Sequence, residues 1–231
     1  DSLTEKLLLT SANSINVARW LPQQIYYVLA LKQWLKNHSE NPVICVPSGN
    51  FGNICAGILA HHRGLPVEHF IAACNVNDVV PEYLRTEILK PKETVATISN
   101  AMDVGDPSNF VRILELFDKE FNQVKNKLSG YTIDDEETLK TIERVEKDYG
   151  YVLDPHGAVA FVALEKYLAE NGGKGFFLET AHPVKFPDSV EKATGKSVEI
   201  PKSLEELMKQ EKFTTEINPQ YEELKEFLLK K

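Results

Sequence analysis

The sequence predicts an α/β fold with a mainly parallel, open sheet flanked by helices. Short apolar runs rich in Val, Ile, Phe and Cys recur along the chain, and longer segments with helical periodicity separate them. Parallel strands need a long crossover between them, which is usually a helix. This alternation of strand and helix therefore favours a parallel sheet over an antiparallel one.

The apolar runs give the predicted strands. They are residues 43–47 (VICVP), 69–74 (HFIAAC), 94–98 (TVATI) and 175–179 (GFFLE). Most of them are apolar along their whole length, which is typical of strands that helices cover on both faces.

The periodic segments give the predicted helices. They are residues 14–36, 52–63, 108–128, 134–148, 155–170, 203–211 and 219–230. Asp154 followed by Pro155 is a typical helix start, with a capping side chain before a proline in the first turn. The chain becomes rich in Lys and Glu after about residue 195, so we expect one main α/β region over 1–195 and a helical covering segment over 196–231.

Composition excludes several classes of function. The 231 residues are 42% hydrophobic and carry a formal net charge of -8, which argues against a nucleic-acid or anionic-membrane partner. No apolar run is long enough to span a membrane. Cys45, Cys55 and Cys74 lie in apolar contexts, which indicates buried, reduced thiols and a cytoplasmic location. No group of residues has the spacing of a metal site.

The loop at residues 48–53 (SGNFGN) is the first candidate site, because it joins strand 43–47 to helix 52–63. Ligands of open parallel sheets bind beyond the carboxyl ends of the strands. Glycines allow close approach of the backbone, and the N–H groups at a helix start favour an anion, above all a phosphate. A plain tight turn is the alternative. The loop has neither the P-loop pattern nor the dinucleotide fingerprint.

This loop resembles the cofactor-phosphate loop of the threonine synthase family, which are pyridoxal-phosphate enzymes of fold type II. Four further stretches resemble the same family and occur in the same order along the chain. They are residues 11–27, 96–112, 153–160 (LDPHGAVA) and 179–190 (ETAHPVKFPDSV). The resemblance extends from about residue 7 to residue 195, which would make residues 1–195 the C-terminal part of the cofactor-binding catalytic region.

The resemblance implies an activity and a cofactor site. Family members convert O-phosphohomoserine and water to threonine and phosphate, with pyridoxal 5'-phosphate as the electron sink. Thr180 would hydrogen-bond the pyridine nitrogen, although its position alone is as well explained by a strand-end or capping threonine. The cofactor phosphate would meet the backbone N–H groups of Gly49, Asn50, Phe51, Gly52 and Asn53.

Four further residues are candidates for substrate contact. Ser14, Asn16 and Arg19 lie at a predicted helix start that suits the substrate phosphate, and the alternative is that Asn13 or Ser14 only caps that helix. His156 follows the capping Asp154 and would face the site from a helix start, unless it is a structural histidine.

The resemblance also implies a lysine that forms a Schiff base with the cofactor, in a Ser-Phe-Lys-Asp-like context upstream of residue 13. No lysine of this chain has that context, and Lys185 does not correspond to it. We therefore expect a C-terminal portion that contains no catalytic residue and is inactive alone. Its partner would be the missing N-terminal half, and exposed apolar surface would lead the chain to self-associate.

Two other functions remain open from the sequence. One is another fold type II lyase that resembles threonine or serine dehydratases. The other is a non-catalytic, phosphate-binding relative that has lost the lysine.

Overall fold

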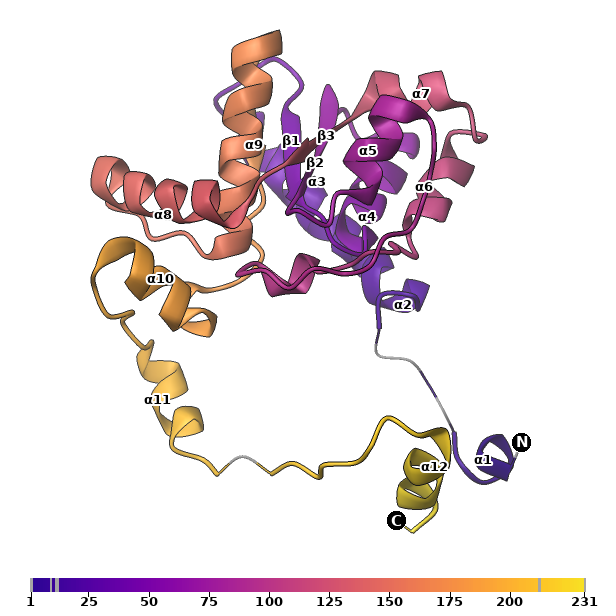
Figure 1. The fold of residues 1–231 in the computed structure, drawn as a ribbon. Coiled ribbons are helices and arrows are strands. Elements are labelled where there is room, and N and C mark those ends of the chain that lie inside the picture. Colours follow the sequence, from indigo (N-terminus) through magenta and orange to yellow (C-terminus); the bar gives the residue numbers. More distant parts are fainter. Residues whose placement is uncertain (1, 9, 11–12, 212, 231) are drawn as a thin grey trace. The chain divides into compact units, whose positions relative to one another are not determined.

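The computed structural model describes residues 2–8, 10, 13–211 and 213–230 (Figure 1). The chain divides into two compact units, of which one combines Asp1–Ala12 with Glu199–Lys231 and the other is Asn13–Val198. The first unit contains the short helices α1 (Ser2–Lys6), α11 (Lys202–Met208) and α12 (Tyr221–Leu229). The second unit contains the sheet and the candidate site.

The sheet has four strands in the order β3-β2-β1-β4, and every pairing is parallel. The fold class predicted from the sequence is therefore confirmed. The strands are β1 (Val43–Pro47), β2 (His69–Cys74), β3 (Leu128–Thr132) and β4 (Gly175–Phe177).

Helices flank the sheet on both sides. Figure 1 shows α8 and α9 on one side of the strands and α4 to α7 on the other. The helices of this unit are α2 (Val17–Trp20), α3 (Gln24–Trp34), α4 (Gly52–His62), α5 (Val79–Thr86), α6 (Phe110–Leu116), α7 (Phe121–Lys127), α8 (Asp135–Tyr149), α9 (Pro155–Asn171) and α10 (Pro187–Thr194). Short 3-10 turns occur at Leu21–Gln23, Asn100–Met102 and Pro183–Lys185.

Alternation along the strands divides the core into two layers, because successive side chains of a strand point to opposite faces. Ile44 of β1 and Phe70 of β2 pack with α4, whereas Cys45 and Ile71 pack with α9. Both central strands are buried at every position. The apolar runs in the sequence follow from this double coverage.

The predicted strand 94–98 is wrong. Its N–H groups are bound by side chains instead of a neighbouring strand: Val95 donates to Asn77 Oδ1 at 2.8 Å, and Thr97 donates to Asp103 Oδ2 at 3.0 Å. The fourth strand is instead β3, which pairs with β2 and which begins where the predicted helix 108–128 ends, in a stretch for which no strand was predicted.

The two longest predicted helices are interrupted. Segment 108–128 contains α6 and α7, separated at Asp118 and Lys119, whose φ angles of 53° and 61° do not fit a helix. Segment 14–36 contains α2, a 3-10 turn that includes Pro22, and α3. The N-cap prediction for α9 is confirmed, since Asp154 accepts from the N–H of His156 at 2.9 Å.

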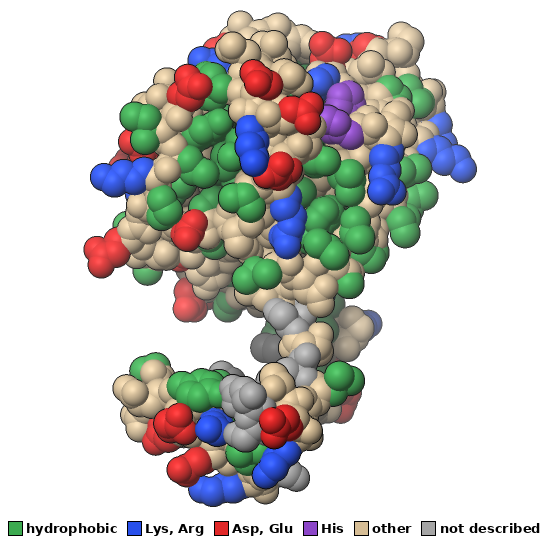
Figure 2. All heavy atoms as spheres, turned by 90° about the vertical axis from the view of Figure 1, so that its right-hand side faces the viewer, with side chains coloured by type: hydrophobic (Ala, Val, Ile, Leu, Met, Phe, Trp, Pro, Cys, Tyr) green, Lys and Arg blue, Asp and Glu red, His purple; other side chains and the backbone are tan. Residues whose placement is uncertain are grey.

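Charged side chains are mixed with hydrophobic ones on the face shown in Figure 2. In the part of the chain that is described, no helix is long and apolar enough to cross a membrane.

Candidate functional site

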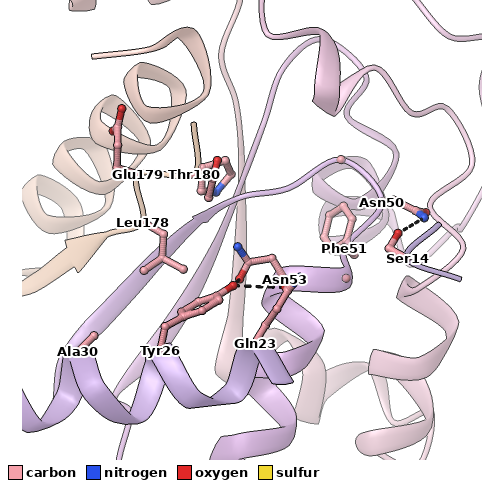
Figure 3. A pocket seen from close by; sticks show the side chains of 13 residues that line it. Ser14, Gln23, Tyr26, Ala30, Asn50, Phe51, Asn53, Leu178, Glu179 and Thr180 are labelled. Carbon is pink, nitrogen blue, oxygen red and sulfur yellow. Dashed lines mark hydrogen bonds between the residues drawn. The ribbon is translucent and has the colours of Figure 1, made fainter. Parts of the chain in front are cut away.

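A pocket lies where β1 and β4 end. Because the two strands are parallel neighbours, their carboxyl ends meet at one edge of the sheet. The segment after β1 and the segment after β4 both line a cavity of about 650 Å³ (Figure 3). Its lining residues are Ser14, Gln23, Tyr26, Ala30, Pro47, Gly49, Asn50, Phe51, Gly52, Asn53, Leu178, Glu179 and Thr180.

The loop between β1 and α4 presents backbone N–H groups. Phe51 caps α4 in the left-handed conformation, with φ 60°, and its ring is 4% exposed and packs edge-on against Phe110 at 5.6 Å. The first internal bond of this turn runs from Cys55 N–H to the Phe51 carbonyl. Within the described chain, the N–H groups of 49–54 donate no hydrogen bond to protein. Such a row of donors at the positive end of a helix favours an anion.

At Gly49 the loop packs directly against the backbone of Ala101 and Met102. A Cβ at this position would lie 2.6 Å from Met102 Cα and 2.9 Å from the Ala101 carbonyl oxygen. No side chain fits at that distance without a shift of the 3-10 turn at Asn100–Met102. Glycine at 49 therefore keeps the loop close to that turn.

Asn50 connects the loop to two other segments. Its Nδ2 donates to Ser14 Oγ at 2.8 Å, and its Oδ1 accepts from the N–H and the hydroxyl of Ser108 at 2.7 and 2.9 Å. Asn109, which is fully buried, donates to the Asn50 carbonyl at 2.9 Å and to Ser14 Oγ at 3.4 Å. Arg112 binds Asn109 Oδ1 as well.

Asn53 is held from α3. Its Oδ1 accepts hydrogen bonds from the hydroxyls of Tyr26 and Tyr27, the latter at 2.7 Å, and Tyr27 also reaches the Asn53 carbonyl at 3.0 Å. Burial raises the pKa of both tyrosines well above the ordinary value, so both hydroxyls remain protonated donors at physiological pH. Figure 3 shows Tyr26 and Asn53 side by side on the pocket wall.

Thr180 reaches the pocket from the opposite side. Beyond the last residue of β4, Leu178 N–H still donates to the Cys45 carbonyl at 2.9 Å and continues the pairing with β1. Thr180 follows two residues later, is exposed, and lines the cavity. The predicted cofactor residues 49–53 and Thr180 are therefore all brought together in one pocket.

The predicted substrate residues are only partly brought together. Ser14 lines the pocket. Asn16, and not the expected Asn13 or Ser14, caps α2 by accepting from Ala18 N–H at 3.1 Å. Arg19 is exposed and, like Asn16, is not among the lining residues.

His156 is buried away from the cavity, and protein atoms bind both of its ring nitrogens. Its Nδ1 is 2.6 Å from Asp154 Oδ1, and its Nε2 accepts from Ala101 N–H at 3.2 Å. Since Nε2 is an acceptor, the proton lies on Nδ1. In this arrangement His156 supports the Asn100–Met102 turn against which Gly49 packs.

Several contributors were missed from the sequence: Gln23, Tyr26, Ser108, Asn109, Arg112 and Glu179. The resemblance of residues 96–112 pointed to the segment that carries three of them. Nothing in the sequence identified which of its side chains reach the loop.

The pocket as a whole suits an anionic ligand with an apolar ring. Its polar groups are amides, hydroxyls and backbone N–H groups, and its one acidic side chain belongs to Glu179. No lysine lies among the lining residues, and the described residues contain no group of His, Cys, Asp and Glu that could hold a metal ion.

Comparison with known proteins places this site in a family. The sequence model described as "Pyridoxal-phosphate dependent enzyme" matches residues 11–176, which include the whole sheet and the loop after β1. The chain belongs to the family of pyridoxal-phosphate-dependent enzymes, and the fold is that of their type II members.

Within this family the similarity is to threonine synthases. The model described as "Threonine synthase, C-terminal" matches residues 157–228. Threonine synthase of Escherichia coli is 47% identical over 206 residues, which are 89% of this chain and 47% of that protein. Its counterpart of Buchnera aphidicola subsp. Schizaphis graminum is 45% identical over 231 residues, 53% of that protein.

Solved structures give the same result. The crystal structure of threonine synthase from Escherichia coli matches with a TM-score of 0.92 and 43% identity, covering 100% of this chain and 53% of the other. The pyridoxal-phosphate-bound threonine synthase from Brucella melitensis matches with a TM-score of 0.86 and 30% identity, covering 98% and 55%. The chain spans about half the length of the curated relatives it matches.

Proposed function

We propose that this chain is the cofactor-phosphate-binding half of a threonine synthase, which converts O-phosphohomoserine and water to threonine and phosphate. The observation that carries the proposal is the row of backbone N–H groups over 49–53, which donate to nothing in the described protein and belong to residues that line the pocket. The similarity to threonine synthases over nearly the whole chain supports the choice of reaction.

The residues around the pocket fit pyridoxal phosphate. The N–H groups of Gly49, Asn50, Phe51, Gly52 and Asn53 would bind its phosphate, and the Thr180 hydroxyl would bind its ring nitrogen. When bound, this cofactor withdraws electrons from the substrate carbon at which a proton is removed. A neutral hydroxyl at the ring nitrogen, in place of a carboxylate, does not hold that nitrogen protonated.

Substrate recognition would involve Ser14, which lies beside the loop after β1. Ser14 Oγ accepts from Asn50 and Asn109, so these two side chains fix its position at the pocket. Asn16 and Arg19, two and five residues further along the same segment, would add donors from outside the cavity. We propose O-phosphohomoserine as the substrate because the chain is similar to threonine synthases over nearly its whole length.

The isolated 231-residue chain is proposed to be inactive. A lysine is needed to bind the cofactor covalently and to move protons, and the described lining of the pocket contains none. Residues of the other half of the full-length protein would supply it.

The proposed function is tested with the full-length protein and with this chain. The full-length protein, supplied with pyridoxal phosphate and O-phosphohomoserine, is expected to release threonine and phosphate in equal amounts, and the chain alone is expected to release neither. Turnover of serine or threonine but not O-phosphohomoserine would instead assign a dehydratase. Absence of turnover with retained phosphate binding would assign a binding protein.

Three further properties accompany this proposal. We propose that the chain self-associates when separated from the other half, which the exposed apolar side chains of α3 support. We also propose that the protein works in the cytoplasm, because all three cysteines are buried, unpaired thiols. Burial raises the pKa of each of these thiols, so none is a reactive thiolate at physiological pH.

A further inference from the structure

Glu179 has a buried carboxyl group that the proposed mechanism does not use. It lies between Leu178 and Thr180, and alternate residues of an extended segment point in opposite directions. In Figure 3 the Glu179 side chain points away from Tyr26 and Asn53, toward the helices behind the pocket. Its Oε1 accepts from Asp154 N–H at 3.2 Å. Its Oε2 is buried and has no hydrogen-bond partner in the described residues.

The first turn of α9 surrounds this carboxyl group closely. A Cβ on Gly157 would lie 2.0 Å from Glu179 Oε2, so the carboxyl group occupies the space beside the helix that glycine leaves open. The neighbouring Asp154 carboxylate already accepts from His156 N–H at 2.9 Å and lies 2.6 Å from His156 Nδ1. Asp154 is thus a helix cap whose hydrogen bonds favour the ionised form, and no described cation forms an ion pair with Glu179 that would offset a second charge.

Two adjacent buried carboxyl groups cannot both be ionised at low cost. Burial and the interaction with Asp154 raise the pKa of Glu179 to about 8. Burial alone would raise the pKa of Asp154 as well, but the hydrogen bonds from His156 and Glu179 bring it below its ordinary value. The remaining titratable neighbour is Tyr151, whose pKa is raised by burial and by these two acids.

We propose that Glu179 is a positioning residue that acts as the neutral acid. The neutral carboxyl group accepts from Asp154 N–H, which anchors residues 178–180 to the start of α9 and holds Thr180 at the pocket edge. Loss of that proton would place two negative charges together behind Thr180 and displace the segment. The consequence for the cofactor depends on the proposed function, whereas the protonation state does not.

The protonation state is measured first, by infrared spectroscopy of the 231-residue chain. At pH 6.5 we expect a protonated carboxyl C=O band that shifts when glutamate is labelled with ¹³C, is absent from Glu179→Gln, and disappears as the pH rises through about 8. Glu143→Gln, which changes an exposed glutamate of α8, should leave the band unchanged. A chain without this band at pH 6.5 would overturn the proposal.

The effect on Thr180 is measured by titrating the full-length apoprotein with pyridoxal phosphate between pH 7 and pH 9. If only the neutral form holds Thr180 in place, a pKa of about 8 predicts a loss of affinity of about tenfold across this range. Over the same pH range, the affinity of the Glu179→Gln protein for pyridoxal phosphate should fall by less than about threefold. The affinity of Glu143→Gln should fall as it does in the wild type.

The outcomes separate this inference from the proposed function. A full-length protein that binds no pyridoxal phosphate at any pH contradicts the proposed function, while the infrared band still decides the state of Glu179. Binding with equal pH dependence in wild type and Glu179→Gln contradicts the positioning role and leaves the proposed function intact.

Discussion

Each residue of the loop after β1 has its own structural role, which follows from the atoms that it contacts. Gly49 allows contact with the backbone at Met102, Phe51 turns the chain into α4, and Asn53 is clamped by hydroxyls from α3. The N–H groups that face the pocket belong to the same short stretch. A substitution there is therefore expected to affect ligand binding more than it affects the fold.

Gly49→Ala tests this expectation. The added Cβ would lie 2.6 Å from Met102 Cα, and overpacking of this kind costs about 1–3 kcal/mol. The loop must move, so we expect pyridoxal phosphate to bind the full-length protein at least about tenfold more weakly. Fluorescence titration of the apoprotein measures the affinity.

Gly150→Ala is the matched control. Gly150 has a φ of 66° and nothing within 4 Å of its added Cβ, so strain costs a similar amount, about 1–2 kcal/mol, away from the pocket. Equal losses of cofactor affinity in both variants would show that the contact of Gly49 with Met102 is not needed for cofactor binding.

Glu179 gives a prediction for stability against pH. Its pKa is about 8 in the folded chain and 4.5 ordinarily, so the folded state keeps a proton that the unfolded state releases between these values. The stabilisation is complete below pH 4.5 and is lost as the pH approaches 8. The free energy of unfolding in urea is measured for the wild type and for Glu179→Gln. The difference between the two values should fall as the pH rises, by at most about 1.4 kcal/mol per pH unit.

A difference between the two chains that stays constant from pH 5 to pH 8 would contradict this prediction. Asp154 does not interfere in the window, because its pKa lies below the ordinary 3.8 and its own contribution is lost only in stronger acid.

At the scale of elements, the start of α6 fixes the loop after β1. Ser108 and Asn109 hold Asn50 from one side, and Arg112 extends the network to the Ile15 carbonyl at 2.8 Å. Three segments far apart in sequence thus meet through neutral hydrogen bonds. Because Asn109 is fully buried, each lost donor leaves an acceptor that water does not reach.

Asn109→Asp removes the donors of Asn109 and keeps its shape. The new oxygen would face the Asn50 carbonyl, so we expect the free energy of unfolding to fall by about 1–3 kcal/mol. Chemical denaturation of the 231-residue chain measures it. Asn171→Asp, at an exposed bond to the Tyr167 carbonyl at the end of α9, is expected to cost much less. Equal costs would show that the buried network contributes nothing.

The helices and strands differ in how well the sequence predicted them. β1, β2 and α9 were predicted because apolar runs and caps are local signals. β3 was missed because LSGYT contains a glycine and a serine, follows directly on a predicted helix, and becomes a strand only through pairing with β2. Residues 94–98 look like a strand, but side chains satisfy their backbone.

The same distinction holds for the site. Residues 48–53 form one motif, so they could be predicted together with Thr180. Tyr26 and Asn109 reach that motif across 27 and 59 positions of sequence, and only the folded arrangement brings them there. The burial of His156 could not be foreseen either, since its Nε2 partner lies 55 positions away.

At the scale of the whole molecule, the outstanding feature is apolar surface on α3. Ile25, Val28 and Leu29 are 62%, 49% and 55% exposed and lie at helical spacings that place them on one stripe. The same helix lines the pocket through Tyr26 and Ala30. A contiguous apolar stripe beside a pocket marks a surface that another polypeptide covers.

We expect this stripe to drive self-association of the isolated chain. The double variant Ile25→Glu with Leu29→Lys would remove two exposed apolar side chains, and its i,i+4 pair of opposite charges would keep α3 helical. Sedimentation velocity at micromolar concentrations should show a dimer or larger species for the wild-type chain and a monomer for this variant. The control Ile88→Glu with Tyr149→Lys changes side chains that are 66% and 67% exposed elsewhere, and it should remain associated. A wild-type chain that sediments as a monomer, or a control that dissociates equally, would exclude α3 as the surface through which copies of this chain meet.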